Sequence, residues 1–129
     1  MILLLRFTFV FFFGGLVYQV LELSWRKYTH ISMFFAGAIS FTAINLLHMF
    51  LWESHPIATI LLSGLAITVV EFIVGYIVNI KMKLKVWDYS KNKFNFKGQV
   101  CLLFTFLWTL LSIPAIYFSG IIANLTSIA

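Results

Sequence analysis

Charge is scarce in this chain of 129 residues. Only 10% of the residues are charged, against roughly 25% in a soluble domain, while 62% are hydrophobic. So little charge excludes a separate water-soluble domain, and residues 1–129 are expected to form a single membrane domain. The sequence also has no glycine-rich phosphate loop, so any ATP that drives this protein is expected to be bound by another chain.

Cysteine and acidic residues are equally scarce. With Cys101 as the only cysteine, no disulfide can form within the chain. The four acidic residues, three histidines and one cysteine show no metal-ligand spacing, and no Ser-His-Asp or Cys-His grouping supports catalysis. We therefore expect no enzyme activity, no metal and no cofactor. The net charge of +5 is assigned to membrane topology and anionic lipid rather than nucleic acid, because the basic residues flank apolar runs.

Long apolar runs are what the chain has in abundance. Four of them, at about 1–23, 31–52, 57–80 and 99–118, are expected to be transmembrane helices, because about 20 apolar residues in a helix cross the hydrocarbon. Pro56 suits the first turn of the third helix. Pro114 is expected to kink the fourth helix and Ser119-Gly120 to end it. The predicted fold is all-α, a polytopic integral membrane protein built as a bundle of four transmembrane helices.

The residues between the spans predict the orientation in the cell membrane. The first loop carries Arg26 and Lys27, the third loop carries six lysines, and the second loop, 53–56, carries no Lys or Arg. The positive-inside rule therefore places the first and third loops in the cytoplasm and both termini outside. Four aromatic residues are expected at the cytoplasmic headgroup level: Trp25, Tyr28, Trp87 and Tyr89.

Glu71 lies in the interior of the third span, where a carboxylate facing lipid costs at least about 2.5 kcal/mol. It is therefore expected to face inward, on a narrow stripe of residues spaced three or four apart: Gly64, Thr68, Glu71, Gly75 and Asn79. The candidate buried polar site comprises Glu71, Gly75, Thr68, His48 and Glu22. Structural alternatives remain open, since such stripes also form packing seams, Glu22 can pair with Arg26, and His48 can hydrogen-bond for structure alone.

The third loop contains the most distinctive local string. The candidate motif there comprises Trp87, Asp88, Tyr89, Ser90, Asn95 and Gly98. Asp88 is expected to cap its own turn by accepting a backbone N–H near Ser90. Asn95 is expected to cap the N-terminus of the fourth helix, and Gly98 to allow close approach at the start of that helix.

These residues resemble the bacterial family called "putative ABC-transporter permease, type IV". The likeness rests on Glu71-x-x-x-Gly75, the Trp87-Asp88-Tyr89-Ser90 string, Asn95-x-x-Gly98 and Cys101, and it extends to Trp25-Arg26, Tyr28-Thr29-His30 and Met33. It covers about residues 14–114. Longer members of that family carry a proline-rich element after the first basic loop, where this chain has Ser32-Met33-Phe34-Phe35.

The leading functional hypothesis is a small permease-like transporter subunit with Glu71 as its buried polar site. The resemblance implies a separate ATPase subunit as a partner, and four helices make a thin wall, so a homodimer is expected. The alternative is a non-transport membrane scaffold or lipid-binding envelope protein that uses the basic, aromatic segment 81–98. A small-ion channel or proton-coupled exporter is a third possibility.

Overall fold

The computed structural model describes residues 1–126 and confirms the all-α prediction. Its four long helices are α1 (Ile2–Arg26), α2 (Ile31–Leu51), α3 (Pro56–Gly75) and α4 (Leu102–Leu125). A π-helical segment, η1 (Tyr76–Lys81), continues α3 to the end of the third span. Two short antiparallel strands, β1 (Asn95–Phe96) and β2 (Val100–Cys101), precede α4. We call residues 82–101, between η1 and α4, loop three.

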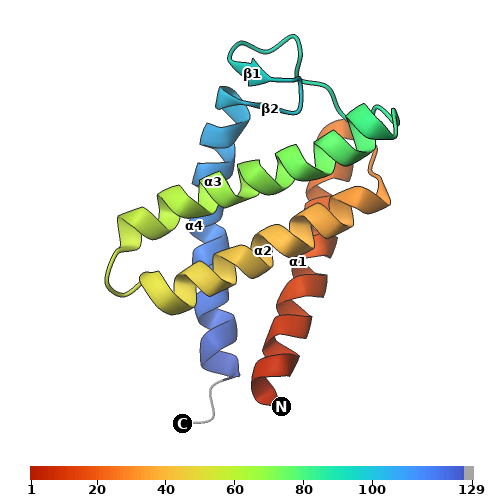
Figure 1. Ribbon diagram of the computed structural model, residues 1–129. Coiled ribbons are helices and arrows are strands. Elements are labelled where there is room, and N and C mark those ends of the chain that lie inside the picture. The colour runs from red at the N-terminus through yellow and green to blue at the C-terminus, as the bar shows by residue number, and fades with distance from the viewer. Residues whose placement is uncertain (127–129) are drawn as a thin grey trace.

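The helices form two pairs that cross. α1 and α4 run along the molecule, and the hairpin of α2 and α3 passes in front of them (Figure 1). α1 packs mainly on α2, α4 packs mainly on α3, and the backbones of α1 and α4 touch little. The N-terminus lies at one end of the molecule and loop three at the other (Figure 1). Loop three is therefore well placed to cover the helix ends on its side.

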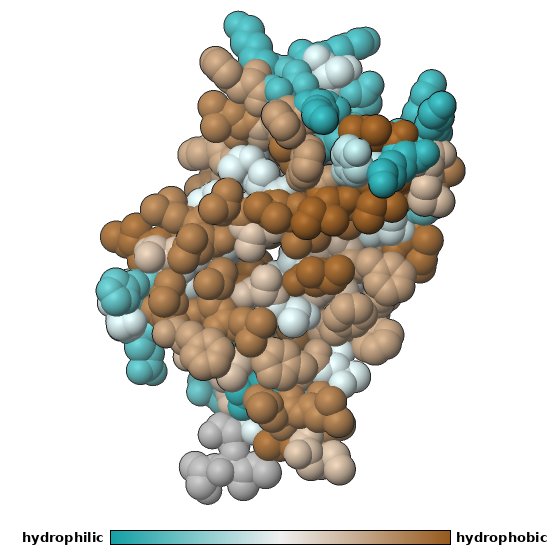
Figure 2. All heavy atoms as spheres, viewed as in Figure 1, coloured by the Kyte–Doolittle hydropathy of each residue, from teal (hydrophilic) through white to brown (hydrophobic). Residues whose placement is uncertain are grey.

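The exterior of the four helices is apolar. Each has the length and hydropathy needed to cross a membrane, and residues such as Leu61 and Phe106 are more than half exposed. Hydrophobic side chains cover the middle of the molecule, while hydrophilic ones gather on loop three and at the turn between α2 and α3 (Figure 2). This distribution fits a chain whose surface is solvated by lipid in the middle and by water at its ends.

The start of α4 differs from the prediction. The helix begins at Leu102, not near residue 99, because residues 95–101 form the β1–β2 hairpin. Asn95 does not cap α4. Its side-chain oxygen accepts from the Gly98 N–H (3.0 Å) inside the hairpin turn. Gly98 has a φ of +72°, a conformation that glycine adopts without steric cost, so its role is to make this turn.

The end of α4 also differs from the prediction. The helix passes through Pro114 and does not stop at Ser119-Gly120 but continues to Leu125. Gly120 faces α2, where a Cβ atom would lie 3.3 Å from Nε2 of His48. The glycine therefore permits close helix packing, which in membrane proteins is a common role of small residues, and does not end the helix.

Candidate functional site

The polar stripe of α3 faces α4 and loop three. Thr68 donates to the Gly64 carbonyl oxygen (3.0 Å) and contacts the Thr105 hydroxyl of α4 at 3.0 Å. A Cβ atom on Gly75 would lie 2.7 Å from Oε1 of Gln99 and 2.8 Å from the Trp87 ring. Thr68 thus belongs to a packing seam between α3 and α4, and Gly75 makes room for loop three.

Glu71 lies on the same stripe and is only 3% exposed. The Tyr89 hydroxyl and the Trp108 indole face its carboxylate, but neither carboxylate oxygen completes a hydrogen bond within residues 1–126. Tyr18 packs against Trp108 with ring centroids 5.7 Å apart. Glu71 is therefore a buried acidic group inside a membrane span, screened by aromatic side chains from three different parts of the chain.

Arg26 joins α1 to loop three next to this group. Its Nε lies 3.5 Å from Oε2 of Glu22, which is the helical pair that the four-residue spacing predicts. Its Nη2 donates to the Tyr89 hydroxyl oxygen (2.7 Å). Glu22 is 7% exposed, so the pair is largely covered by protein. Arg26 thus contacts both Glu22 and the Tyr89 hydroxyl, and that hydroxyl also faces the Glu71 carboxylate.

The prediction that Trp87 and Tyr89 anchor at the headgroup level is wrong, because both side chains point into the protein. Trp87 is 5% and Tyr89 6% exposed. The Trp87 indole donates to the Gln99 carbonyl oxygen (2.9 Å), and Tyr89 stacks on Phe104 of α4 with ring centroids 4.6 Å apart. Burial, followed by the nearby Glu71 carboxylate, raises the pKa of Tyr89. Tyr89 is therefore a neutral phenol at physiological pH.

Two polar side chains determine the path of loop three. Asp88 Oδ1 accepts the Ser90 N–H (2.9 Å), which is the expected Asx turn, and hydrogen bonds from Ser90 hold the pKa of Asp88 below its ordinary value. Asn79 of η1 accepts the Val86 N–H (2.6 Å) and donates to Oε1 of Gln99 (2.7 Å). The turn and the Asn79 bridge together direct the two aromatic side chains inward.

The structure brings most of the predicted residues together, but not all. Glu71, Glu22 and Gly75 lie with Trp87 and Tyr89 at the end of the bundle that loop three covers. His48 does not join them. It lies in the last turn of α2, next to Trp52 and Gly120, at the other end of the hairpin.

Sequence reasoning did not include three residues of this region in the candidate site. Tyr18 and Trp108 form the aromatic screen near Glu71, and Gln99 joins loop three to η1. The sequence does place Tyr18 and Glu22 on one side of α1, and the four-residue spacing adds Arg26 to that face. Gln99 carries no comparable local signal. Within residues 1–126, no group of three or more His, Cys, Asp or Glu residues is positioned to hold a metal ion.

Four long apolar helices, polar ends and a carboxylate buried inside the bundle define the class of this chain: it is a multi-pass α-helical membrane protein. A family model described as "Putative ABC-transporter type IV" matches residues 2–128, so the chain belongs to this family. No curated protein and no solved structure matches the chain.

Proposed function

We propose that this protein is a permease-like subunit of a membrane transporter, with Glu71 as the polar group on its pathway. The observation that carries the proposal is the Glu71 carboxylate, buried at 3% exposure with both oxygens unpartnered within residues 1–126. Helix packing alone needs no carboxylate at that place, and an ionisable group inside a membrane span is costly to keep. A role in binding or passing a cation or proton accounts for it.

The neighbours of Glu71 support the same function. Arg26, a basic group that acts on Glu71, is already shared by Glu22 and Tyr89 and so is not dedicated to neutralising Glu71. Tyr89, on loop three, lies between Arg26 and Glu71. A movement of loop three would therefore uncover the carboxylate and change its electrostatic surroundings together, as a gate does.

We further propose that loop three is cytoplasmic and is the surface that a separate ATPase subunit contacts. The outer face of loop three is exposed, and the loop is anchored to α1 and α4 through Tyr89 and to η1 through Asn79. A rigidly anchored loop can transmit a push from a partner to the helices. Two copies of the chain, with four spans each, would bring eight helices together around a pathway.

The alternative function, a non-transport scaffold or envelope protein, rests on the same loop. Phe94 and Phe96 are 79% and 57% exposed among the exposed lysines. Aromatic and basic side chains together suit the surface of an anionic membrane. In that case, loop three is the working surface and Glu71 only supports the fold.

Complementation of a strain that lacks the chain separates the two functions. Glu71→Gln keeps the shape and hydrogen-bonding capacity of the side chain but removes its charge. Glu53→Gln, in the exposed turn after α2, is the matched control. For a transporter, we expect loss of complementation with Glu71→Gln and retention with Glu53→Gln and with Lys91→Gln/Lys93→Gln. The scaffold function predicts the reverse for Glu71 and the two lysines, and a fully active Glu71→Gln protein rules out the pathway role.

Purification in mild detergent tests the partner. The tagged chain is expected to bring down a protein that hydrolyses ATP, identified by mass spectrometry and by vanadate-sensitive activity in the eluate. Glu71→Gln should leave this association intact because Glu71 is buried, away from the surface of loop three. Purification of the chain without any nucleotide-hydrolysing protein would argue against the ATPase-coupled form of the proposal.

A further inference from the structure

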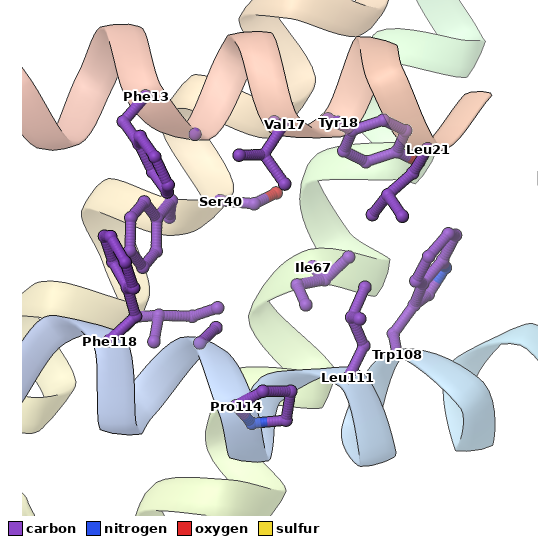
Figure 3. A pocket seen from close by; sticks show the side chains of 15 residues that line it. Phe13, Val17, Tyr18, Leu21, Ser40, Ile67, Trp108, Leu111, Pro114 and Phe118 are labelled. Carbon is purple, nitrogen blue, oxygen red and sulfur yellow. The ribbon is translucent and has the colours of Figure 1, made fainter. Parts of the chain in front are cut away.

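An apolar groove lies between α1 and α4, where three aromatic pairs connect the two helices. The ring centroids are 4.5 Å apart in the Phe13–Phe118 pair, 5.7 Å in the Tyr18–Trp108 pair and 5.9 Å in the Trp25–Phe104 pair. Hollows of about 290 and 390 Å³ lie between successive pairs, and both have Leu21, Leu111 and Pro114 in their walls. Figure 3 shows the first hollow, with Phe13 and Phe118 at one end and Tyr18 and Trp108 at the other. We call the two hollows together the α1–α4 groove.

The walls of the α1–α4 groove suit methylene groups and not water. Its first hollow is lined almost entirely by carbon, with the Ser40 hydroxyl as an exception that points into it (Figure 3). Water needs two to four polar partners to be stable in a cavity. Since α1 and α4 are membrane spans whose outer faces are apolar, the molecules that meet this groove are lipids.

One end of the α1–α4 groove is charged. Glu22 and Arg26 line the second hollow, beside Trp25, which is 69% exposed. Arg26 is the last residue of α1 and Lys27 follows it, so both lie where lipid headgroups begin. The contacts of Arg26 with Glu22 and Tyr89 use Nε and Nη2, so neither of them occupies Nη1. A guanidinium with an unused N–H group binds phosphate oxygens well.

We infer that the α1–α4 groove binds an acyl chain of an anionic glycerophospholipid from the surrounding bilayer, with the lipid phosphate on Arg26. The apolar hollows take the chain, and Arg26, which lines the second hollow, selects the charge of the headgroup. A helix from a second copy fits this place poorly, because a helix is about 10 Å wide with its side chains and the aromatic pairs divide the groove. Such a site would serve a transporter and a scaffold equally.

Native mass spectrometry of the full chain in mild detergent tests this site, with dioleoylphosphatidylglycerol and dioleoylphosphatidylcholine as probes. We expect one tightly retained lipid and a preference of about fivefold for the anionic probe, the size of effect that one basic residue near a membrane surface gives. Arg26→Gln should abolish the preference, whereas Lys93→Gln, at an exposed lysine of loop three outside the groove, should keep it. Ala115→Phe fills the first hollow and should reduce the retention of both lipid probes. Ala123→Phe, on the same helix but outside the groove, should leave their retention unchanged.

Two further variants guard against effects on folding. Tyr89→Phe removes a partner of Arg26 but leaves its charge, so it should retain the preference for the anionic probe. Val17→Phe fills the first hollow from the α1 side if the Ala115 variant does not fold. Unchanged lipid retention in both filled variants, or equal retention of the two probes by the parent protein, overturns the inference. A lipid-free dimer that the filled variants dissociate does so too, since a second copy then occupies the groove.

Discussion

Replacing Tyr89 by Phe tests how loop three is held on the helices. The change removes one hydroxyl oxygen, which lies 2.7 Å from Nη2 of Arg26, and leaves the aromatic ring in place. The ring keeps its stack on Phe104, and Arg26 keeps its contact with Glu22. Loss of stability in this variant therefore reports the contacts of the Tyr89 hydroxyl, which are its hydrogen bond with Arg26 and its approach to the Glu71 carboxylate.

The size of the effect follows from the charge and exposure of Arg26. A hydrogen bond to a charged group contributes about 1.5–3 kcal/mol to stability. The Arg26 side chain is 23% exposed, so water can replace part of the lost interaction, and we expect the lower end, about 1.5 kcal/mol. Tyr89→Ala also removes a ring that is buried against Phe104, and truncation of a buried aromatic costs roughly 3–5 kcal/mol.

Chemical unfolding in mild detergent measures these losses, and hydrogen exchange locates them. Tyr89→Phe should speed exchange of the amides in loop three while those in the middle of α2 stay protected, because the tie is local to α1 and the loop. Tyr117→Phe is the control, since Tyr117 is 63% exposed on α4. A double-mutant cycle with Arg26→Gln isolates the pair, and we expect a coupling of about 1 kcal/mol or more.

A coupling near zero would refute this account of the loop. The same holds if Tyr89→Phe is as stable as the parent protein and its loop exchanges no faster. Either result would mean that the packing of Trp87 against Gly75 and the Asn79–Val86 hydrogen bond, not the Arg26–Tyr89 bond, hold loop three in place.

Two further predictions concern the orientation and the turn of loop three. With Cys101 replaced, a cysteine introduced at position 91 should be shielded from an impermeant thiol reagent in intact cells, and one introduced at position 54 should be labelled. Labelling at position 91 but not at position 54 would mean that the orientation is the reverse of the predicted one. Asp88→Ala should speed exchange in loop three and Asp88→Asn should not, since an amide oxygen can also accept the Ser90 N–H. Hydrogen bonds from Ser90 lower the pKa of Asp88, so the ionised carboxylate stabilises the turn. This stabilisation should be complete above about pH 4 and should decline as the pH falls through the lowered pKa.

Parts of the candidate site were predictable because they depend on neighbours in the sequence. The Glu22–Arg26 pair follows from a four-residue spacing on one helix, and the Asp88 turn follows from an acceptor two residues before the donor. The inward position of Glu71 follows from the cost of placing a carboxylate against lipid. Each of these needs no knowledge of how the helices are arranged.

Other parts depend on residues far apart in the sequence. Arg26 and Tyr89 are separated by 63 positions, and their contact exists only because loop three folds back over the ends of the helices. The usual membrane preference of Trp and Tyr predicted the headgroup level for Trp87 and Tyr89, but a buried carbonyl and a guanidinium satisfied their polar groups inside the protein. His48 was grouped with Glu71 by residue type, and the antiparallel hairpin places it at the opposite end.

The sequence by itself determined that this chain is helical and lies in a membrane. An apolar run of about 20 residues indicates directly that the segment is surrounded by lipid and not by water. It could not determine where α4 begins, since the β1–β2 hairpin needs the Tyr89 N–H to reach the Gly98 carbonyl oxygen (2.7 Å) across the loop. Nor could it reveal the α1–α4 groove. Lipid-facing and protein-facing side chains are both apolar in a membrane protein, so hydrophobicity does not say which helix faces meet. The fit of the side chains in three dimensions decided that α1 pairs with α2, that α3 pairs with α4, and that a groove remains between them.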